Sequence, residues 1–320
     1  MRRIVSVSLG ESRRDASAEI NLLGERIRLE RRGVDGDLGA MAALLRELDG
    51  QVDALGIGGA DLGLRVAGRW YPLYEIARAA QVVKRTPVVD GTGLKCTLER
   101  RAAAVVDRLA TPTERRATDP AGSVEMPIAR RVLFTAGADR WGLTEGFLER
   151  GYETVFGDLM FGLGLPFPLR SAAAVIRVAA IAMPIVGRLP FRWVYPIGAA
   201  QSEWRPRFER WYDWAGVIAG DCHYIKRHRP ARLDGKVICT NTTTPADVAL
   251  FREAGAAWLV TTTPRLGGRT FGTNVFEAAL IAARGLGRAL TDAELDEAID
   301  QLGLKPEALD LSEEAHANPG

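Results

Sequence analysis

The sequence is poor in cysteine. Its three cysteines, Cys96, Cys222 and Cys239, lie far apart, and no two of them have the Cys-x-x-Cys spacing. Isolated thiols of this kind exclude a disulfide framework and a cysteine-ligated zinc site, and they are typical of a reducing compartment. The N-terminal residues become charged too soon for a secretory signal peptide. We therefore expect a cytoplasmic protein without a bound metal.

The chain also lacks an excess of charge of one sign. Its 42 basic and 40 acidic residues leave a net charge of +2. Nucleic-acid-binding domains usually carry a strong basic excess, so we expect a small-molecule ligand and no nucleic acid. Hydrophobic residues make up 47% of the 320 positions and charged residues 26%, which is typical of a globular protein with a substantial core.

No apolar run is long enough to span a membrane. The most apolar stretch, residues 171–187, has only 17 residues and contains Arg177 and Pro184. Arginines and aromatic residues flank this stretch, namely Arg170, Arg188, Phe191, Arg192 and Trp193. The pattern leaves two interpretations: a buried or domain-bridging helix, which we prefer, and a helix that lies on a membrane surface.

Three common catalytic signatures are missing from the sequence. It contains no Gly-x-x-x-x-Gly-Lys-Ser/Thr phosphate loop, no His-Glu-x-x-His pair and no Gly-x-Ser-x-Gly elbow. Their absence argues against an NTPase, a zinc peptidase and a serine hydrolase.

What the sequence does contain is a predicted β-α-β unit over residues 131–158. Residues 132–135 form an apolar run that predicts a buried strand, and the pattern of an amphipathic helix and of a second strand follows. The turn after the first strand has Gly137 and Gly142 but lacks the middle glycine of the dinucleotide fingerprint Gly-x-Gly-x-x-Gly. The unit is therefore either a nucleotide site or a β-α-β that only packs.

Charged residues of this unit are candidate cofactor ligands together with its two glycines. Asp158 stands about 20 positions beyond Gly137, where a dinucleotide fold places the carboxylate that binds a ribose hydroxyl. Such a carboxylate favours NAD and repels the 2′-phosphate of NADP. Arg140 in the turn could pair with that phosphate, so NADP is the alternative cofactor. Asp139 lies beside Arg140 in the same turn.

Other predicted strands of the second half also end in polar loops, at Asp221–His223, Asn241–Thr244 and Thr261–Thr263. The carboxyl ends of parallel strands share one edge of a sheet, where ligands bind in a crevice. The candidate cofactor ligands in these loops are Asn241, Thr242, Thr243, Thr261 and Thr262, with helix capping as the alternative role. His223 is a candidate general acid–base, because it follows a strand-end aspartate and imidazole titrates near neutral pH.

The first half carries a second group of charges at strand ends. Asp61, Asp90 and Lys95 each follow a predicted strand. A lysine beside a carboxylate can relay a proton if burial lowers its pKa. Lys95, with Asp61 or Asp90, is therefore a candidate catalytic pair, and solvated loop charges are the alternative.

The alternation of strand and helix patterns in both halves predicts an α/β fold. Residues 110–128 hold three prolines and many small or charged residues, which predicts a linker. We expect a smaller α/β substrate domain over residues 1–115. A Rossmann-like nucleotide-binding domain with a doubly wound parallel sheet should follow over residues 129–320.

Six motifs spread over most of the chain are distinctive: VSVSLGESRRD, TPVVDGTGLK, GDLMFGLGLPFPLRS, VIAGDCH, TNTTTPADV and TTTPRLGGRTFGTNVFEA. In these motifs the chain resembles bacterial proteins labelled quinate 5-dehydrogenase, relatives in name of the shikimate dehydrogenases. The resemblance implies a substrate domain followed by a nucleotide domain. It also implies a catalytic Lys–Asp pair, which Lys95 would form with Asp61 or Asp90. The Asn-Val-Thr substrate motif of shikimate dehydrogenases is not evident near Lys95.

We therefore expect an oxidoreductase that transfers a hydride between NAD, or alternatively NADP, and a polyhydroxylated cyclic acid such as quinate or shikimate. Two alternatives stay open. One is a non-catalytic regulatory protein that binds a nucleotide or metabolite, and the other is a membrane-surface enzyme with a hydrophobic substrate.

Overall fold

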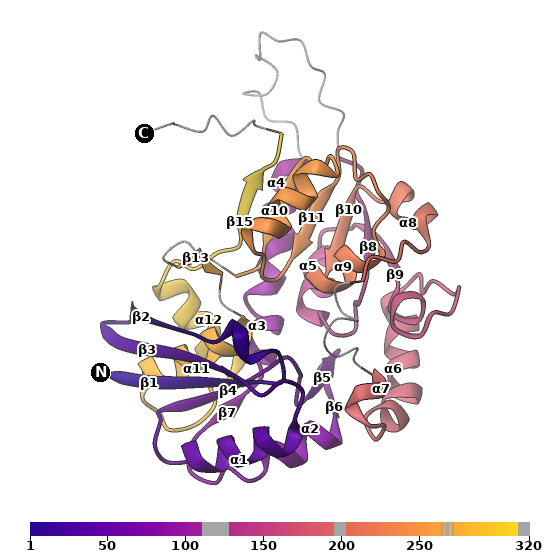
Figure 1. Cartoon of the computed structure of the whole chain (residues 1–320). Helices are drawn as coiled ribbons and strands as arrows, with labels where there is room; N and C mark the ends of the chain where they lie inside the picture. Colours follow the sequence, from indigo (N-terminus) through magenta and orange to yellow (C-terminus); the bar gives the residue numbers. More distant parts are fainter. Residues whose placement is uncertain (111–127, 195–202, 264, 267–268, 271, 313–320) are drawn as a thin grey trace.

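The structure is a computed structural model that describes residues 1–110, 128–194, 203–263, 265–266, 269–270 and 272–312. These residues form two largely parallel β-sheets, each with helices on both faces (Figure 1). The fold is an α/β fold in which a doubly wound sheet follows a smaller α/β sheet, as the sequence pattern predicts. The predicted linker falls mainly on residues 111–127, which lie outside the described residues.

The first sheet has the strand order β2-β3-β1-β4-β7. Its strands are β1 (Arg2–Ser8), β2 (Ala16–Leu22), β3 (Glu25–Gly33), β4 (Ala54–Gly58) and β7 (Val88–Val89). β2 runs antiparallel to β3, and the other neighbours are parallel. The sequence analysis misses β2, an edge strand that buries only its last residue, although its apolar residues Ala16, Ala18, Ile20 and Leu22 alternate with polar ones. A short 3₁₀ turn, η1 (Ser12–Arg14), joins β1 to β2.

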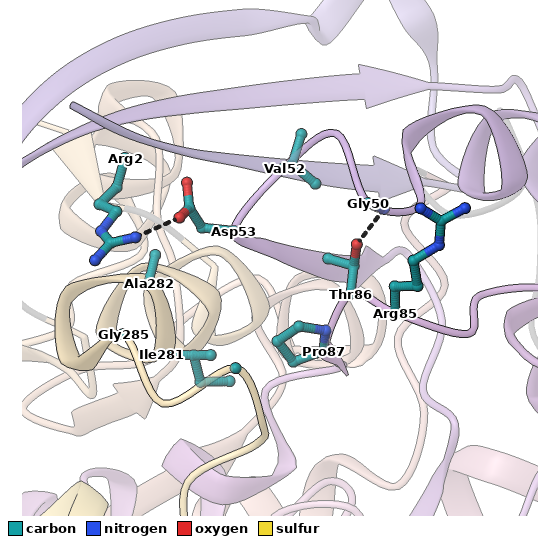
Figure 2. Close-up of a pocket in the computed structure, with 11 residues that line it drawn as sticks. Arg2, Gly50, Val52, Asp53, Arg85, Thr86, Pro87, Ile281, Ala282 and Gly285 are labelled. Atoms are coloured by element: carbon teal, nitrogen blue, oxygen red, sulfur yellow. Dashed lines mark hydrogen bonds and ion pairs between the residues drawn. The ribbon is translucent and has the colours of Figure 1, made fainter.

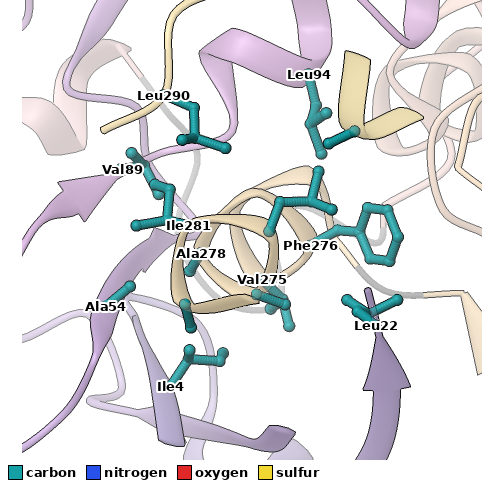
Figure 3. Packing of buried hydrophobic residues seen from close by; sticks show 14 of the residues in the cluster. Ile4, Leu22, Ala54, Val89, Leu94, Val275, Phe276, Ala278, Ile281 and Leu290 are labelled. Carbon is teal, nitrogen blue, oxygen red and sulfur yellow. The ribbon is translucent and has the colours of Figure 1, made fainter. Parts of the chain in front are cut away.

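Side chains on β1 alternate between two hydrophobic layers. Val5 and Val7 pack with the apolar face of α1 (Leu38–Leu48) and with α2 (Tyr74–Ala80). Ile4 points to the opposite layer, where it packs against α11 (Thr273–Arg284), as Figure 3 shows. The first sheet is thus buried on both faces.

The second sheet has the order β15-β12-β11-β10-β8-β9. Its strands are β8 (Arg131–Phe134), β9 (Glu153–Phe156), β10 (Val217–Gly220), β11 (Val237–Thr240), β12 (Trp258–Thr261) and β15 (Glu307–Asp310). All neighbours are parallel except β15, which runs antiparallel to β12. The pattern predicts the five parallel strands. It misses β15, an edge strand with no fully buried residue.

Helices cover both faces of the second sheet, which makes it doubly wound. One layer contains α4 (Ala102–Ala110), α5 (Trp141–Glu149) and α6 (Ala172–Val186). The other contains α8 (Glu209–Trp214), α9 (Cys222–His228) and α10 (Pro245–Glu253). The remaining elements are β5 (Gly63–Val66), β6 (Arg69–Pro72), α3 (Thr92–Cys96), η2 (Glu99–Arg101), a π-helical turn η4 (Asp158–Gly162), α7 (Phe191–Val194), β13 (Arg265–Leu266), β14 (Arg269–Thr270) and α12 (Asp292–Gln301).

Two predicted helices differ from the observed ones. The sequence pattern of residues 96–109 predicts one long helix, but the structure has the end of α3, η2 and α4 there, and this break lets the chain pass from the first sheet to the second. The helical spacing of Trp204, Phe208, Trp211 and Trp214 predicts a helix over residues 198–214, of which only residues from 203 on are described, and α8 begins at Glu209. Trp204 lies outside α8, and its indole N–H donates to the carbonyl of Arg229. The pattern also misses α9, which is only seven residues long. No helix among the described residues has the length and apolar character needed to cross a membrane.

Each sheet is covered in part by helices from the other half of the chain. α4 lies within the predicted first domain but packs on the second sheet. α11 and α12 lie within the predicted second domain but pack on the first sheet. Gly91 allows this return of the chain: its φ is 93°, and a Cβ there would lie 2.4 Å from Oγ1 of Thr273. The hydrophobic face of the first sheet is therefore fully covered only when both halves of the chain are present.

A close contact between α5 and the α3–η2 segment fixes how the two sheets meet. Gly142 and Gly146 lie four residues apart on α5 and so share one face of the helix. A Cβ at Gly142 would lie 2.2 Å from the carbonyl oxygen of Lys95, and one at Gly146 would lie 2.3 Å from that of Arg100. Only glycine leaves room for backbone this close, so Gly142 has a packing role in addition to any role in the turn.

We expect Gly142→Ala to lower the free energy of unfolding by about 1–3 kcal/mol, because the methyl group overpacks against backbone that cannot yield. Gly162→Ala is the control, since a Cβ at Gly162 meets no atom within 4 Å. Its effect should stay within about 0.5 kcal/mol. Urea unfolding of both variants measures the difference, and equal midpoints would contradict the proposed role of the α3–α5 contact.

Candidate functional site

The strand orders place one ligand-binding edge on each sheet. In the second sheet the chain adds β9 on one side of β8 and adds β10 on the other side, so the order of the strands reverses between β8 and β10. In the first sheet the order reverses in the same way between β1 and β4. Crevices form at the carboxyl ends of strands at such switch points. Asp61 follows β4, Asp139 follows β8 and Asp221 follows β10. The two switch points therefore each contribute aspartates.

Lys95 joins the two switch points. Its Nζ donates to Oδ1 of Asp61 at 2.9 Å and to Oδ1 of Asp139 at 2.8 Å. The Lys95 side chain is only 7% exposed, whereas those of Asp61 and Asp139 keep 13% and 18% of their surface. An ammonium group has three N–H donors, so one donor of Lys95 is left after these two bonds.

Arg140 forms the second cationic centre of the same cluster. Its guanidinium donates to Oε1 of Glu99 at 2.6 Å and to Oδ2 of Asp221 at 3.0 Å, and its Nε lies 3.3 Å from Oδ2 of Asp139. Asn241 extends the cluster, because its side-chain amide donates to Asp221 at 2.9 Å. We call the set of Asp61, Lys95, Glu99, Asp139, Arg140 and Asp221 the charge cluster.

Sequence reasoning missed Glu99, and it noted Asp221 as a strand-end residue without making it a site candidate. Glu99 is fully buried. The available signal was its spacing of four residues from Lys95, which places both on one side of a helical segment. Asp221 could have been chosen because it follows β10 at the switch point, but its partner Arg140 was assigned to a cofactor phosphate.

The charge cluster contains two cations and four carboxylates. The carboxylates are of two kinds, according to whether burial or the attraction of the cations decides the direction of the pKa shift. Burial opposes the charges of Lys95 and Arg140, but the surrounding carboxylates outweigh it and raise both pKa values. Burial also opposes ionisation of Asp139 and Asp221, yet Lys95 and Arg140 keep the pKa of Asp139 low, and Arg140 does the same for Asp221.

The other two carboxylates of the cluster hold protons more tightly. Burial raises the pKa of Asp61 to about 7 against the attraction of Lys95, and repulsion from Asp139 adds to the increase. Burial likewise raises the pKa of Glu99, although Arg140 and Lys95 oppose it. A proton on each of these two acids would balance the two cations against the two remaining carboxylates.

The direction of the Lys95 pKa shift is opposite to the predicted one. The prediction assumed that burial lowers the pKa of Lys95, but its two carboxylate partners raise it instead. Lys95 is therefore a fixed cation near neutral pH, and Asp61 is the group of the pair that titrates there. The structure brings Lys95 and Asp61 together as predicted, with the expected roles exchanged.

Two predicted catalytic residues lie outside the charge cluster. Asp90 caps backbone: it accepts from the N–H groups of Leu62 and Thr92. His223 is exposed in the first turn of α9, where its backbone N–H donates to Asp221. No hydrogen bond or ion pair of the His223 side chain with the cluster is found among the described residues. Its charge nevertheless helps Arg140 to keep the pKa of Asp221 low, and its acid–base role stays a prediction.

The turn after β8 does not have the form of a free phosphate cradle. The N–H groups of Gly137 and Ala138 donate to the carboxylate of Asp158, at 3.2 Å and 2.8 Å. A Cβ at Gly137 would lie 2.5 Å from the ring of Phe156. Asp139 occupies the position of the missing middle glycine, and its charge would repel a pyrophosphate. These residues do not fit a dinucleotide bound closely in this turn.

The predicted polar residues at the ends of β11 and β12 lie near the same edge of the second sheet. Asn241 belongs to the hydrogen-bond network of the charge cluster through Asp221. Thr242 and Thr243 follow it and are half-buried. Thr261 and Thr262 are buried, and Oγ1 of Thr262 has no hydrogen-bond partner among the described residues. Their role as cofactor ligands stays a prediction.

A cavity of about 220 Å³ lies at the other end of the first sheet, away from the charge cluster. Figure 2 shows that Arg2, Asp53 and Pro87 line it, and these residues stand at or before the starts of β1, β4 and β7. Arg2 is paired with Asp53 there at 2.9 Å. In the described part of the chain, no group of three His, Cys, Asp or Glu side chains is arranged to hold a metal ion.

Fold and site define an α/β protein of two sheets, with a buried charge cluster where their switch points meet. Residues 93–311 match the family model described as a domain of unknown function (DUF8754), and the chain belongs to this family. Residues 3–90 match the model of a second domain of unknown function (DUF8753). The two models meet in the loop between β7 and α3, just before Lys95.

Among solved structures, the chain is similar to a Mycobacterium smegmatis protein in complex with β-D-fucofuranose (12% identity, 98% of this chain and 92% of that chain, TM-score 0.33). It is also similar to a putative malic enzyme (15%, 93% and 76%, TM-score 0.38) and to the malic enzyme of Entamoeba histolytica (12%, 91% and 60%, TM-score 0.40). These values carry no information on the ligand of this chain. The comparison with curated proteins finds no match.

The raised pKa of Asp61 has a consequence for stability. Its ordinary value is 3.8 and its folded-state value is about 7. Between these values the folded protein keeps a proton that the unfolded chain releases, so this group stabilises the fold at low pH and the stabilisation is lost as the pH rises. The slope from one such group is at most about 1.4 kcal/mol per pH unit.

We therefore expect Asp61→Asn to reduce the fall in unfolding free energy between pH values of about 4 and 7. Asp49→Asn is the control, because backbone N–H groups, first that of Lys84, lower the pKa of Asp49 to about 2. Its contribution is lost only as the pH falls below about 4. Urea titrations across this range test the expectation, which is wrong if the Asp61 variant keeps the wild-type slope.

Proposed function

We propose that the protein is an enzyme that acts on a hydroxyl group of a small polyhydroxylated acid, such as quinate or shikimate. The observation that carries the proposal is the position of Lys95 Nζ between the carboxylates of Asp61 and Asp139. These three groups come from both sheets, at the edges where ligands bind in α/β proteins. The resemblance to quinate and shikimate dehydrogenases, with their Lys–Asp pair, supports the same centre.

The chemistry of the centre follows from its charges. The remaining N–H donor of Lys95 can bind a substrate oxygen and stabilise negative charge on it. Asp61 can accept the hydroxyl proton at neutral pH and return it, because its pKa lies at about 7. Asp139 stays ionised and holds Lys95 in place. The partly exposed carboxylates of Asp61 and Asp139 can accept hydrogen bonds from neighbouring hydroxyls of a polyhydroxylated ligand.

The proposed reaction class is oxidoreduction, with NAD as the hydride acceptor and NADP as the alternative. The turn after β8 does not fit a closely bound pyrophosphate, so a dinucleotide would be held less closely than in a standard fingerprint. All three cysteines, Cys96, Cys222 and Cys239, have free thiols, which fits the reducing environment of the cytoplasm.

A second candidate function is the non-catalytic binding of a metabolite. The observation that favours it is the same turn, in which Asp158 takes up the backbone N–H groups that would bind a phosphate. Thermal-shift titration with NAD, NADP, quinate and shikimate separates the two functions, since a ligand of the folded state raises the melting temperature. Binding of a hydroxy acid without reduction of either cofactor would favour the metabolite-binding function.

If the dehydrogenase proposal holds, Lys95→Met and Asp61→Asn should each lower kcat by about 10²–10⁴-fold, the range of general acid–base contributions. Lys226→Met is a matched control, because Lys226 forms an ion pair with Asp247 outside the charge cluster. Its turnover should stay near that of the wild type. The measurement is NADH or NADPH formation with quinate and shikimate. Wild-type turnover in the Lys95 variant would refute the assignment, and no reduction by the wild type would refute the proposed reaction.

A further inference from the structure

Residues 159–202 form a segment without a single acidic residue, in a chain that has 40. Asp158 and Glu203 bound the segment, which contains η4, α6 and α7. It contains four arginines, Arg170, Arg177, Arg188 and Arg192, and no lysine. The segment is thus both the most apolar part of the chain and one of purely positive charge.

The helices of this segment are anchored on one side only. Val175 and Ala179 of α6 are buried against the second sheet, and Phe191 of α7 is buried in the hydrophobic layer of the first sheet. The opposite side carries large apolar side chains that face solvent: Ile181 is 75% exposed, Ile185 is 65% exposed and Trp193 is 70% exposed. Ile181 and Ile185 lie one turn apart and so share one side of α6, whereas Trp193 lies on the separate short helix α7.

Arginines accompany these apolar side chains. Arg177 precedes Ile181 by one turn on α6, Arg188 follows the end of α6, and Arg192 precedes Trp193 on α7. All three are exposed, and none forms an ion pair with a carboxylate among the described residues. Arg188 lies over the ring of Tyr74, at 4.8 Å from its centroid, which holds this arginine at the surface.

The loop that leads into α6 adds further exposed apolar side chains. Leu163, Leu165 and Phe167 are all exposed in it. In Figure 1 this loop, α6 and α7 lie together at the right-hand side of the molecule, beyond the second sheet. We call the exposed apolar and arginine side chains of the loop, α6 and α7 the α6–α7 face.

We propose that the α6–α7 face docks on the surface of a bilayer that contains anionic phospholipids. Arginine side chains bind lipid phosphates and attract a negatively charged surface, while isoleucine and tryptophan side chains enter the boundary between headgroups and acyl chains. The segment itself contributes no carboxylate that an anionic surface would repel, and the negative charge beside it is that of Glu75 on α2, which accepts from the N–H of Phe191. The proposal concerns a different part of the molecule from the charge cluster, and it does not depend on the proposed reaction.

Co-sedimentation of the full chain with vesicles tests this docking. We expect binding to vesicles of phosphatidylcholine mixed with phosphatidylserine, little binding to phosphatidylcholine alone, and weaker binding as the salt concentration rises. The variant Arg177→Gln/Arg192→Gln should bind the anionic vesicles about fivefold more weakly for each arginine removed. The variant Ile181→Ser/Ile185→Ser/Trp193→Ser should lose most of its binding.

Two matched controls carry the same substitutions at exposed positions elsewhere, Arg46→Gln on α1 and Leu286→Ser after α11. Both should bind the anionic vesicles as the wild type does. Melting temperatures equal to that of the wild type show that the variants are folded, as expected for changes at exposed side chains. If the three-site variant does not fold, the arginine variant still tests the proposal.

Three results would overturn the docking proposal. The first is equal binding to neutral and anionic vesicles, and the second is binding that neither α6–α7 variant changes. The third is no vesicle binding together with concentration-dependent oligomers that Trp193→Ser abolishes, which would assign the face to contact between copies of the chain.

Discussion

The ion pairs of Lys95 connect the two sheets, and the rest of the site is arranged around them. Asp61 comes from the first sheet and Asp139 from the second, so the charge of Lys95 is balanced only while both sheets keep their relative positions. Breaking a buried pair leaves an uncompensated charge, which costs about 3–5 kcal/mol. The glycines of α5 serve the same geometry, because they let the α3–η2 backbone approach until Lys95 lies beside the turn after β8.

The position of these charges follows from strand order. In each sheet the chain first adds strands on one side of its first strand and later adds a strand on the other side, which opens a switch point. The loops with Asp61, Asp139 and Asp221 lie at these two points. The charge cluster thus forms because the two sheets have similar strand orders and their switch points lie close together. It also joins the regions matched by two separate family models, which meet just before Lys95.

Sequence patterns predict those parts of this molecule that have a local periodic signal. The nine predicted parallel strands are found, and most of them, such as β1 and β4, carry runs of buried apolar residues. β15 is missed and has no fully buried residue, whereas β2 is missed although its apolar residues alternate with polar ones. The proximity of Lys95 and Asp61 was predicted from their positions at strand ends. The partners Asp139 and Arg140 were assigned to a cofactor instead, because the pattern of a turn does not show which groups from other elements enter it.

The remaining features of the site depend on tertiary contacts that no local pattern records. The direction of the Lys95 pKa shift depends on a second carboxylate, that of Asp139, which lies 44 positions away in the sequence. The covering of each sheet by helices from the other half of the chain likewise depends on tertiary contacts. α11 is an apolar helix whose residues 275–282 are all buried, and nothing in that pattern tells which of the two sheets it will cover.

Because α11 and α12 cover the first sheet, the order of synthesis on the ribosome affects how long that sheet stays uncovered. The apolar face that Ile4 and Ala54 present to α11 stays bare until residues 273–301 have left the ribosome. At about 5–20 residues per second, this interval is on the order of 10 s or more. During that time the nascent first sheet displays parallel strands and uncovered hydrophobic surface. A chaperone that shields such surfaces therefore has a defined period in which to act, and that period ends when the last helices dock.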